Sequence, residues 1–447
     1  MRVSCLLLAA VASVLACGVS AQYCLNEEGE TVDWFVVVKV RTHKAQRPNG
    51  KQQHADNTNT ETTTARERAR TWRQTTLSRD DKARIVADLF FAVRACFSLQ
   101  MPRRTESSDP NVSVGLGYIY GDAKSYQDPS NFWTNSSKSI GDPTSAVGRT
   151  VQQVYDNASS SGQGYQFYND ENPDGTTSMS YGHTKGILGW QADSAFWLVH
   201  SVPKFCDTPA NVQTYAYPST GEEYGQSMIC VSLNTANVDS AFAQFMYTNP
   251  QVYGSQWVSS MTSQMPNGNA FVNSGTVVTN SASNVINIST VGGVEFMHFA
   301  KTVAWGKSIY GDLIGPYYQS DMVVETWQRP YEAPLQPPQV QQAVYSVLTL
   351  SAPSYANWDG VTWKESEDHA KWGIVTDRTV PVLCIGDINK QVTQWKRSGG
   401  MLCITDQTLH QNFNMMITTT DESSKPQTAA QVAKELHDGD AVRVATE

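Results

Sequence analysis

One short motif occurs twice in the chain with the same layout downstream, and this repeat restricts the folds that the chain can adopt. His183-Thr184-Lys185 and His369-Ala370-Lys371 are each followed by an apolar run, a turn and a second apolar run. Ser201 follows the first histidine, and Asp387 the second, at the same spacing of 18 residues. Apolar runs around a polar turn are typical of paired strands. The pattern therefore predicts two similar halves.

The two motifs also predict a reactive site. Residues i and i+2 of a strand lie on one face, so each histidine and its lysine are expected to point the same way. Cleavage of a phosphodiester needs a nucleophile, cations for the anionic oxygens and an acid for the leaving alkoxide. His183, Lys185, His369 and Lys371 provide this set, so we predict that they are catalytic and that no cofactor or metal ion takes part. A structural role is the alternative for either histidine alone.

The apolar runs predict a mixed α/β chain. Strands are expected at residues 32–40, 186–190, 196–199, 293–301, 322–327, 373–375 and 382–385. Helices are expected at residues 146–155 and 238–247. Residues 41–110 are polar except for an apolar run at 85–99 that is compatible with a short helix. This segment is either a largely unstructured insertion, a basic DNA-binding arm or an artefact of the gene model.

The N-terminus predicts export. A positive charge at Arg2 precedes an apolar stretch too short to span a bilayer, and small residues end near position 21, so residues 1–21 are expected to be a signal peptide. A short membrane anchor is the alternative, but we expect no membrane insertion elsewhere. Four Asn-x-Ser sequons then become candidate glycosylation sites. They are Asn111, Asn135, Asn157 and Asn287.

The charge distribution favours an acidic compartment if the substrate is nucleic acid. The formal net charge is −9. Residues 41–104 hold 14 Lys/Arg against 6 Asp/Glu, which leaves 19 basic against 36 acidic residues elsewhere. Such a surface repels a polyanion at neutral pH. Near pH 5 carboxylates begin to protonate and histidines become charged, so the repulsion falls.

Several longer segments resemble the deoxyribonuclease II family. They are VDWFVVVKV, YNDENP, GHTKGILGW, FWLVHSVPKF, YGQSMICVS, DHAKWGI, CIGDINK and GGMLC, in the family's order and over about residues 24–42 and 115–415. The resemblance implies a fold similar to the phospholipase D superfamily, a duplicated α/β/α sandwich with one His-x-Lys motif per half. We expect the first half at residues 22–205, the second at 206–420 and a polar tail at 421–447.

The resemblance also implies an activity. It is that of a metal-independent endonuclease that cleaves double-stranded DNA at acid pH and leaves 3′-phosphate and 5′-hydroxyl ends. Degradation of engulfed or apoptotic DNA, in lysosomes or after secretion, is the expected role. A phosphohistidine intermediate follows as a hypothesis, and a homodimer is one possible assembly. The alternatives are a catalytically impaired DNA-binding relative and a phosphodiesterase with another substrate.

The resemblance carries over to further residues. It implies disulfides Cys24–Cys230 and Cys384–Cys403, and leaves Cys96 and Cys206 unassigned. Ser201, Asp387 and Asn389 are expected to support the site. Pro203 stands where the first half would match Asn389. The two halves are therefore expected to support their histidines unequally, although the sequence does not say which histidine attacks.

Overall fold

The computed structural model describes residues 21–39, 97–100, 110–121, 132–353 and 361–422. The chain divides into a larger unit, residues 1–43 and 94–447, and a smaller unit, residues 44–93, which lies outside the described residues. The predicted signal peptide and most of the predicted insertion and tail also lie outside them. Everything below concerns the larger unit.

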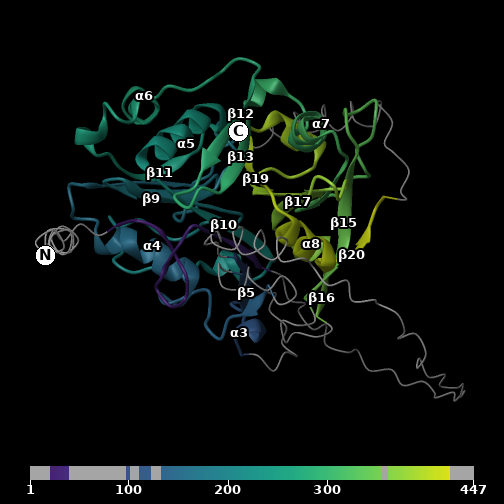
Figure 1. Cartoon of the computed structure of the whole chain (residues 1–447), viewed down its shortest axis with the longest axis horizontal. Coiled ribbons are helices and arrows are strands. Elements are labelled where there is room, and N and C mark those ends of the chain that lie inside the picture. The colour runs from purple at the N-terminus through teal and green to yellow at the C-terminus, as the bar shows by residue number, and fades with distance from the viewer. Residues whose placement is uncertain (1–20, 40–96, 101–109, 122–131, 354–360, 423–447) are drawn as a thin grey trace, which may run out of the picture. The chain divides into compact units, whose positions relative to one another are not determined.

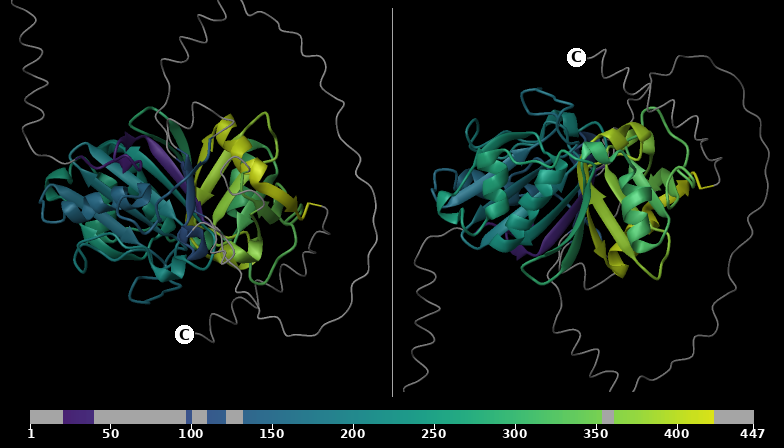
Figure 2. Two further views of the ribbon diagram at one scale, coloured as in Figure 1. Left: turned by 90° about the horizontal axis from the view of Figure 1, so that it is seen from below. Right: turned by 90° about the horizontal axis from the view of Figure 1, so that it is seen from above.

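The described part of the larger unit is a mixed α/β fold with two sheets of nine strands each (Figures 1 and 2). The first sheet has the order β11-β7-β8-β9-β10-β3-β5-β4, with β6 beside β5. Its strands are β3 (Trp34–Lys39), β4 (Phe97–Gln100), β5 (Tyr118–Gly121), β6 (Thr134–Asn135), β7 (Gln163–Tyr168), β8 (Gly186–Gln191), β9 (Ser194–His200), β10 (Gln226–Leu233) and β11 (Val252–Gln256).

The second sheet has the order β12-β13-β19-β18-β17-β14-β15-β16, with β20 beside β15. Its strands are β12 (Ser283–Ser289), β13 (Glu295–Lys301), β14 (Met322–Thr326), β15 (Val344–Ser351), β16 (Thr362–Lys364), β17 (Lys371–Val375), β18 (Val382–Gly386), β19 (Gly399–Thr405) and β20 (Ile417–Thr420). The α/β class and the strand pairs that follow both motifs are confirmed.

Five neighbouring strands of one sheet match five of the other. The run β7-β8-β9-β10-β3 corresponds to β14-β17-β18-β19-β13, and every adjacent pair in both runs is antiparallel. In each run the first four strands stand in chain order, and the fifth comes from an earlier part of the chain. The outer strands differ, because β11 is antiparallel to β7 while β15 is parallel to β14. The repeated motif therefore lies at the same place in two matching sets of strands.

The helices cover the sheets and link them. They are α3 (Pro110–Ser113), α4 (Ala146–Asp156), α5 (Thr235–Thr248), α6 (Pro266–Ser274), α7 (Gly315–Tyr318) and α8 (Gln407–Met416). Helix α5 follows β10 as α8 follows β19, and each begins with a side-chain cap, from Asn234 and Asp406 respectively. Helix α5 contacts strands of both sheets. Its Gln244 donates to the ring Nδ1 and the carbonyl of His298 on β13, over 2.8 and 2.9 Å.

Each sheet has its own apolar core. In the first, Val147, Val151 and Val154 of α4 pack on side chains such as Ile187 and Phe196. In the second, residues such as Met322, Val382 and Met401 form a separate cluster. Each core is thus built around one of the two runs of matching strands.

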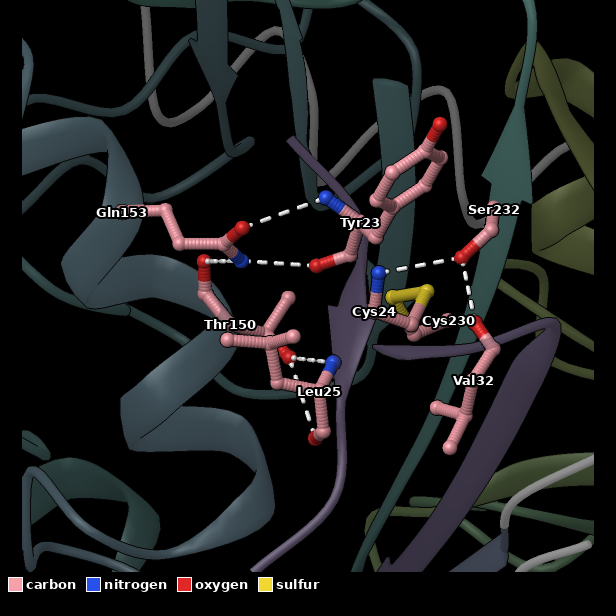
Figure 3. The surroundings of a disulfide bond; sticks show 8 residues. All are labelled: Tyr23, Cys24, Leu25, Val32, Thr150, Gln153, Cys230 and Ser232. Carbon is pink, nitrogen blue, oxygen red and sulfur yellow. Dashed lines mark hydrogen bonds between the residues drawn. A yellow bond between two sulfur atoms is a disulfide. The ribbon is translucent and has the colours of Figure 1, made fainter. Parts of the chain in front are cut away.

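A disulfide and several hydrogen bonds hold the N-terminal segment of the described chain to the first sheet (Figure 3). Cys24 of strand β1 (Cys24–Leu25), which pairs with β2 (Thr31–Val32), is bonded to Cys230. The backbone N–H of Cys24 donates to Ser232 Oγ over 3.0 Å, and that of Leu25 donates to Thr150 Oγ1 over 2.8 Å. The segment is thus part of the folded unit.

Both predicted disulfides are confirmed, since Cys384 and Cys403 are also bonded, across β18 and β19. Among the cysteines that the structure describes, the buried Cys206 is the one without a disulfide. Cys96 lies outside the described residues.

One part of the predicted insertion has a regular structure. Phe97–Gln100 is strand β4 and pairs with both β5 and β10. The helix considered for residues 85–99 is therefore wrong at its C-terminal end, because the ladder on β5 fixes this segment as a strand. Residues 97–100 of the segment that the sequence set apart as an insertion thus belong to the first sheet.

All four sequon asparagines lie in the described chain and are at least partly exposed. Their glycosylation stays a prediction. Within the described segments, no helix combines the length and the apolar character needed to cross a membrane.

Candidate active site

The two His-x-Lys motifs meet where the two sheets lie against each other. His183 precedes β8, and its backbone N–H donates to the carbonyl of Ser398, just before β19, over 2.9 Å. His369 precedes β17, and its backbone N–H donates to the carbonyl of Gly225, just before β10, over 2.8 Å. Each histidine is thus held by a main-chain bond to a residue next to a strand of the other sheet.

The imidazole rings are held in the same crossed manner. His183 Nδ1 donates to the carbonyl oxygen of Asp387 over 2.7 Å. His369 Nδ1 donates to the carbonyl oxygen of Ser201 over 2.9 Å. A carbonyl can only accept, so Nδ1 carries a hydrogen in both rings and Nε2 is left for chemistry. Ser201 and Asp387 are the two residues that the equal spacing marked, and each of them serves the histidine of the other half.

The two lysines are almost completely buried, with 3% of Lys185 and 1% of Lys371 exposed. The backbone N–H of Lys185 donates to Asp387 Oδ1 over 3.2 Å, and that of Lys371 donates to Ser227 Oγ over 3.0 Å. Lys371 Nζ donates to the carbonyl of His369 over 2.8 Å. Burial, and then the positive charge of Lys185, lower the pKa of Lys371 to about 7. Its charge therefore depends on pH near neutrality.

A carboxylate outside both motifs, that of Asp170, lies beside the first histidine. Asp170 forms an ion pair with Lys185 Nζ, and its Oδ2 is 3.4 Å from both His183 Nε2 and Arg397 Nη2. Burial alone would raise the pKa of Asp170, but Lys185, His183 and Arg397 together lower it below its usual value. Asp170 is therefore an anion in the middle of three basic groups.

The corresponding position beside the second histidine is aromatic. Thr326 pairs with Lys371 at the end of β14, and Trp327 is the next residue. Tyr168 pairs with Gly186 at the end of β7, which places Asp170 one residue beyond the partner of Lys185. Trp327 thus matches Asp170, and its ring centroid is 5.3 Å from that of His369. The two histidines have chemically different neighbours.

Burial lowers the pKa of both histidines, but charge acts on them differently. After burial, the largest influence on His183 is Asp170, which raises its pKa. At His369 the next influences are Lys371, Lys185 and His183, which all lower the pKa. Among the described residues, no carboxylate forms an ion pair with His369. His183 is consequently the better placed of the two to carry a positive charge.

The three supporting residues from the sequence lie at the site in different ways. Ser201 Oγ donates to Gln226 Oε1 over 2.6 Å and accepts from the N–H of Ser227 over 2.9 Å. Burial raises the pKa of Asp387 to about 8, although Lys185 lowers it. Asn389 is 5% exposed, and its Oδ1 makes no hydrogen bond within the described structure.

Two further buried carboxyl groups lie next to the second motif. Asp368 accepts from Trp363 Nε1 over 2.9 Å and from the N–H of Ala370 over 2.8 Å. Burial raises its pKa to about 7. Burial also raises the pKa of Glu325 on β14 well above its usual value. Both carboxyl groups are therefore protonated and neutral in acid solution, and they become negatively charged only as the pH rises.

Sequence reasoning missed Asp170, Trp327 and Arg397. The sequence carried a signal for Asp170 and Trp327. Each follows a strand, β7 or β14, that pairs with the strand after a His-x-Lys motif. Four other tryptophans are buried core residues. They are Trp133, Trp190, Trp197 and Trp372, of which 2% or less is exposed.

Comparisons with known proteins give one matching family and several relatives that cover most of the chain. The family described as Deoxyribonuclease II matches residues 93–423. A putative deoxyribonuclease-2 of Burkholderia pseudomallei is 33% identical over 73% of this chain and 88% of its own length. The cell death-related nuclease 6 of Caenorhabditis elegans is 31% identical over 70% of this chain and 82% of its own. Plancitoxin-1 of Acanthaster planci is 30% identical over 70% and 85%.

Proposed function

The chain belongs to the deoxyribonuclease II family and is a deoxyribonuclease, and on this premise we propose that it is an acid endonuclease of double-stranded DNA. In this proposal it needs no metal ion and leaves 3′-phosphate and 5′-hydroxyl ends. The crossed pair of bonds, His183 to Asp387 and His369 to Ser201, is the observation that carries it. It brings two histidines and two lysines from distant parts of the chain into one site.

The fold proposed for this activity is a duplicated phospholipase D-like sandwich. It is supported by the match of five antiparallel strands in one sheet with five in the other. It is also supported by the helices, because α5 follows β10 in the first run as α8 follows β19 in the second. A pseudo-two-fold relation between the halves accounts for the crossed bonds, since such an operation exchanges His183 with His369 and Asp387 with Ser201.

The titratable groups support activity at acid pH. As the pH falls through about 8 and 7, Asp387 and Asp368 become neutral and Lys371 becomes charged. All three changes make the site more positive, which favours a phosphodiester anion. The lysines can then stabilise the non-bridging oxygens in the role that a metal ion fills in other nucleases.

The unequal neighbours of the histidines support a division of labour. We assign His369 as the nucleophile, because its Nδ1 is fixed as a donor and the charges that act on it most strongly, those of Lys371, Lys185 and His183, disfavour its charged form. We assign His183 as the general acid, because Asp170 stabilises a proton on its Nε2. Asp170 acts through His183 and Lys185 and is a positioning residue.

The steps balance with these groups alone. His369 Nε2 forms a bond to phosphorus while the bond to the 5′ oxygen breaks, and the proton of His183 Nε2 passes to that oxygen. His183, now neutral, takes a proton from water as the water attacks the phosphohistidine. The bond to His369 breaks, and the 3′-phosphate leaves.

The setting proposed for this chemistry is the lysosome or the extracellular space, where the enzyme would degrade DNA from engulfed or dying cells. Two disulfides support passage through an oxidising compartment. An acidic site of action also suits the pH dependence proposed above.

Plasmid nicking tests the activity. The purified protein is incubated with supercoiled DNA at about pH 5 in EDTA, beside His183→Ala, His369→Ala and, as a control, His410→Gln. His410 lies on α8 and bonds to the carbonyl of Val375, away from the motifs. Nicking that survives EDTA and His410→Gln but is lost in the two alanine variants is expected. Nicking that depends on added divalent metal would refute metal independence, and no nicking at all would refute the acid endonuclease.

A substrate with a good leaving group tests the division of labour. Thymidine 3′-(4-nitrophenyl phosphate) releases nitrophenolate without a general acid, so His183→Ala should still show a burst of nitrophenolate, and His369→Ala should not. The reverse pattern would exchange the two roles. An acid-labile phosphorylated protein should accumulate in His183→Ala after a quench.

A further inference from the structure

Within the described part of the chain, the aromatic side chains beside His369 have charged residues, not aromatic ones, at the matching positions beside His183. The carbonyls of Ser398 and Gly225 accept the backbone N–H groups of His183 and His369. Arg397 precedes Ser398, and Tyr224 precedes Gly225. Tyr224 therefore matches Arg397, just as Trp327 matches Asp170. A charged pair flanks one histidine and an aromatic pair flanks the other.

The aromatic pair is built as one surface, here called the aromatic platform and formed by Tyr224, Trp327 and Arg329. The rings of Tyr224 and Trp327 are 4.5 Å apart and nearly perpendicular. The Arg329 guanidinium lies 4.5 Å from the Trp327 ring and 5.9 Å from the Tyr224 ring, and donates to the carbonyl of Ser366 over 2.8 Å. The platform therefore combines π faces with a positive charge.

The platform is not part of either apolar core. Tyr224 and Trp327 are only partly buried and Arg329 is exposed. Neither ring belongs to the core cluster of its half. Both rings therefore keep exposed surface next to His369, where a bound ligand can contact them.

We propose that the aromatic platform binds the base of the nucleotide that keeps the 3′-phosphate after cleavage. Aromatic side chains stack on any base, because every base has a π face, and a nearby arginine adds a contact to the phosphate backbone. The departing nucleoside lies on the His183 side, where the general acid is, so the His369 side is open to the retained nucleotide. This inference rests on the proposed function and adds a base-binding subsite to it.

The proposal has a direct test in one duplex. A 5′-labelled duplex of about 12 base pairs carries a single abasic analogue, and a gel resolves cleavage at each linkage. The linkage on the 3′ side of the analogue lacks the retained base, and the linkage on its 5′ side lacks only the departing base. Wild-type protein should cleave the first about 5- to 150-fold more slowly than in the unmodified duplex, and the second at nearly the normal rate.

Variants connect this discrimination to Trp327. Trp327→Ala should slow cleavage of intact linkages by a similar factor and abolish the penalty at the abasic site, while Trp327→Phe should retain both the rate and the penalty. Tyr317→Ala removes a half-exposed aromatic from α7 that packs against Phe299 and Tyr318, and should change neither. Equal cleavage on both sides of the analogue by wild-type protein, or an equal loss at all linkages in Trp327→Ala, would refute the proposal.

A binding measurement decides the matter even if the protein proves inactive. Thymidine 3′-phosphate should bind wild-type protein more tightly than abasic deoxyribose 3′-phosphate, and Trp327→Ala should bind the two equally. Failure of the nicking assay with this preference intact would count against the proposed function alone. Nicking without the preference would count against the base subsite alone.

Discussion

His183 Nδ1 donates a hydrogen bond to the main-chain carbonyl of Asp387 over 2.7 Å, although the two residues are 204 positions apart in the chain. The side chain of Asp387 has a separate partner, the N–H of Lys185. A substitution at Asp387 can therefore change the buried charge while leaving the ring of His183 where it is.

Asp387→Asn should stabilise the protein at high pH. The pKa of Asp387 is raised from 3.8 to about 8 in the folded protein, so its contribution to stability is complete below about pH 4 and is lost as the pH rises to about 8. Asparagine does not titrate and can still accept from Lys185. The variant's advantage in free energy of unfolding should grow over this window, by about 1.4 kcal/mol for each unit by which folding raises the pKa of Asp387. Urea titrations at pH 4.5, 6 and 8 measure it, and a difference that does not change with pH would contradict it.

DNA should bind more weakly as the pH rises from 5 to 8. Over this range Lys371 loses its charge while Asp368 and Asp387 gain theirs. Fluorescence anisotropy with a labelled duplex and the inactive His369→Asn variant measures the dissociation constant without cleavage. Adding Lys371→Met should flatten the dependence around pH 7. A steep loss of affinity that persists in the double variant would assign the effect to other groups.

Asp170→Asn should move the basic limb of the kcat profile to lower pH. Asp170 raises the pKa of His183, and the general acid must be protonated when DNA binds. Without the carboxylate, His183 loses its proton at lower pH, so the rate falls earlier as the pH increases. Rates over pH 4–7 with saturating DNA reveal the limb. Asp170→Glu is the matched variant that keeps the charge, and an unshifted limb in Asp170→Asn would contradict the role given to Asp170.

Gly182→Ala should reduce activity far more than stability. A Cβ at Gly182 would overlap the carbonyl oxygen of Thr248 and lie 3.0 Å from Ser398 Oγ, so the chain next to His183 must shift. A displacement of about 1 Å at a reacting group can cost about 100-fold in rate. Gly162→Ala is the control, because its Cβ would have only an ordinary contact, at 3.8 Å with Ser160 Oγ. Equal kcat values in the two variants would show that the position of His183 tolerates this shift.

The sequence predicted the repeat, the strand pairs after each motif and both disulfides, because these depend on local patterns and on family resemblance. Strand β4 was missed, because Phe97–Gln100 follows a long polar segment and is defined by its pairing with β5. Residues 322–327 were predicted as a strand, but β14 ends at Thr326. That one-residue difference separates Trp327 from the sheet.

The chemistry around each histidine was harder to predict, because it depends on how the halves meet. Asp170 belongs to neither motif, and only the structure shows its contacts with Lys185 and His183. The proline-for-asparagine difference at Pro203 and Asn389 did predict unequal halves. The stronger inequality, a carboxylate against a tryptophan, lies just after the ends of β7 and β14, outside the motifs, where the repeat is not visible in the sequence.

The two imidazole N–H groups donate to main-chain carbonyls, and every amino acid has a main-chain carbonyl. Positions 201 and 387 can therefore carry different side chains, serine at one and aspartate at the other, without releasing either ring. Selection must preserve the path of the backbone at these two positions and the interface between the halves. An isolated half would lack the acceptor for its own histidine, so the gene could not be cut in two and leave either product with a competent centre.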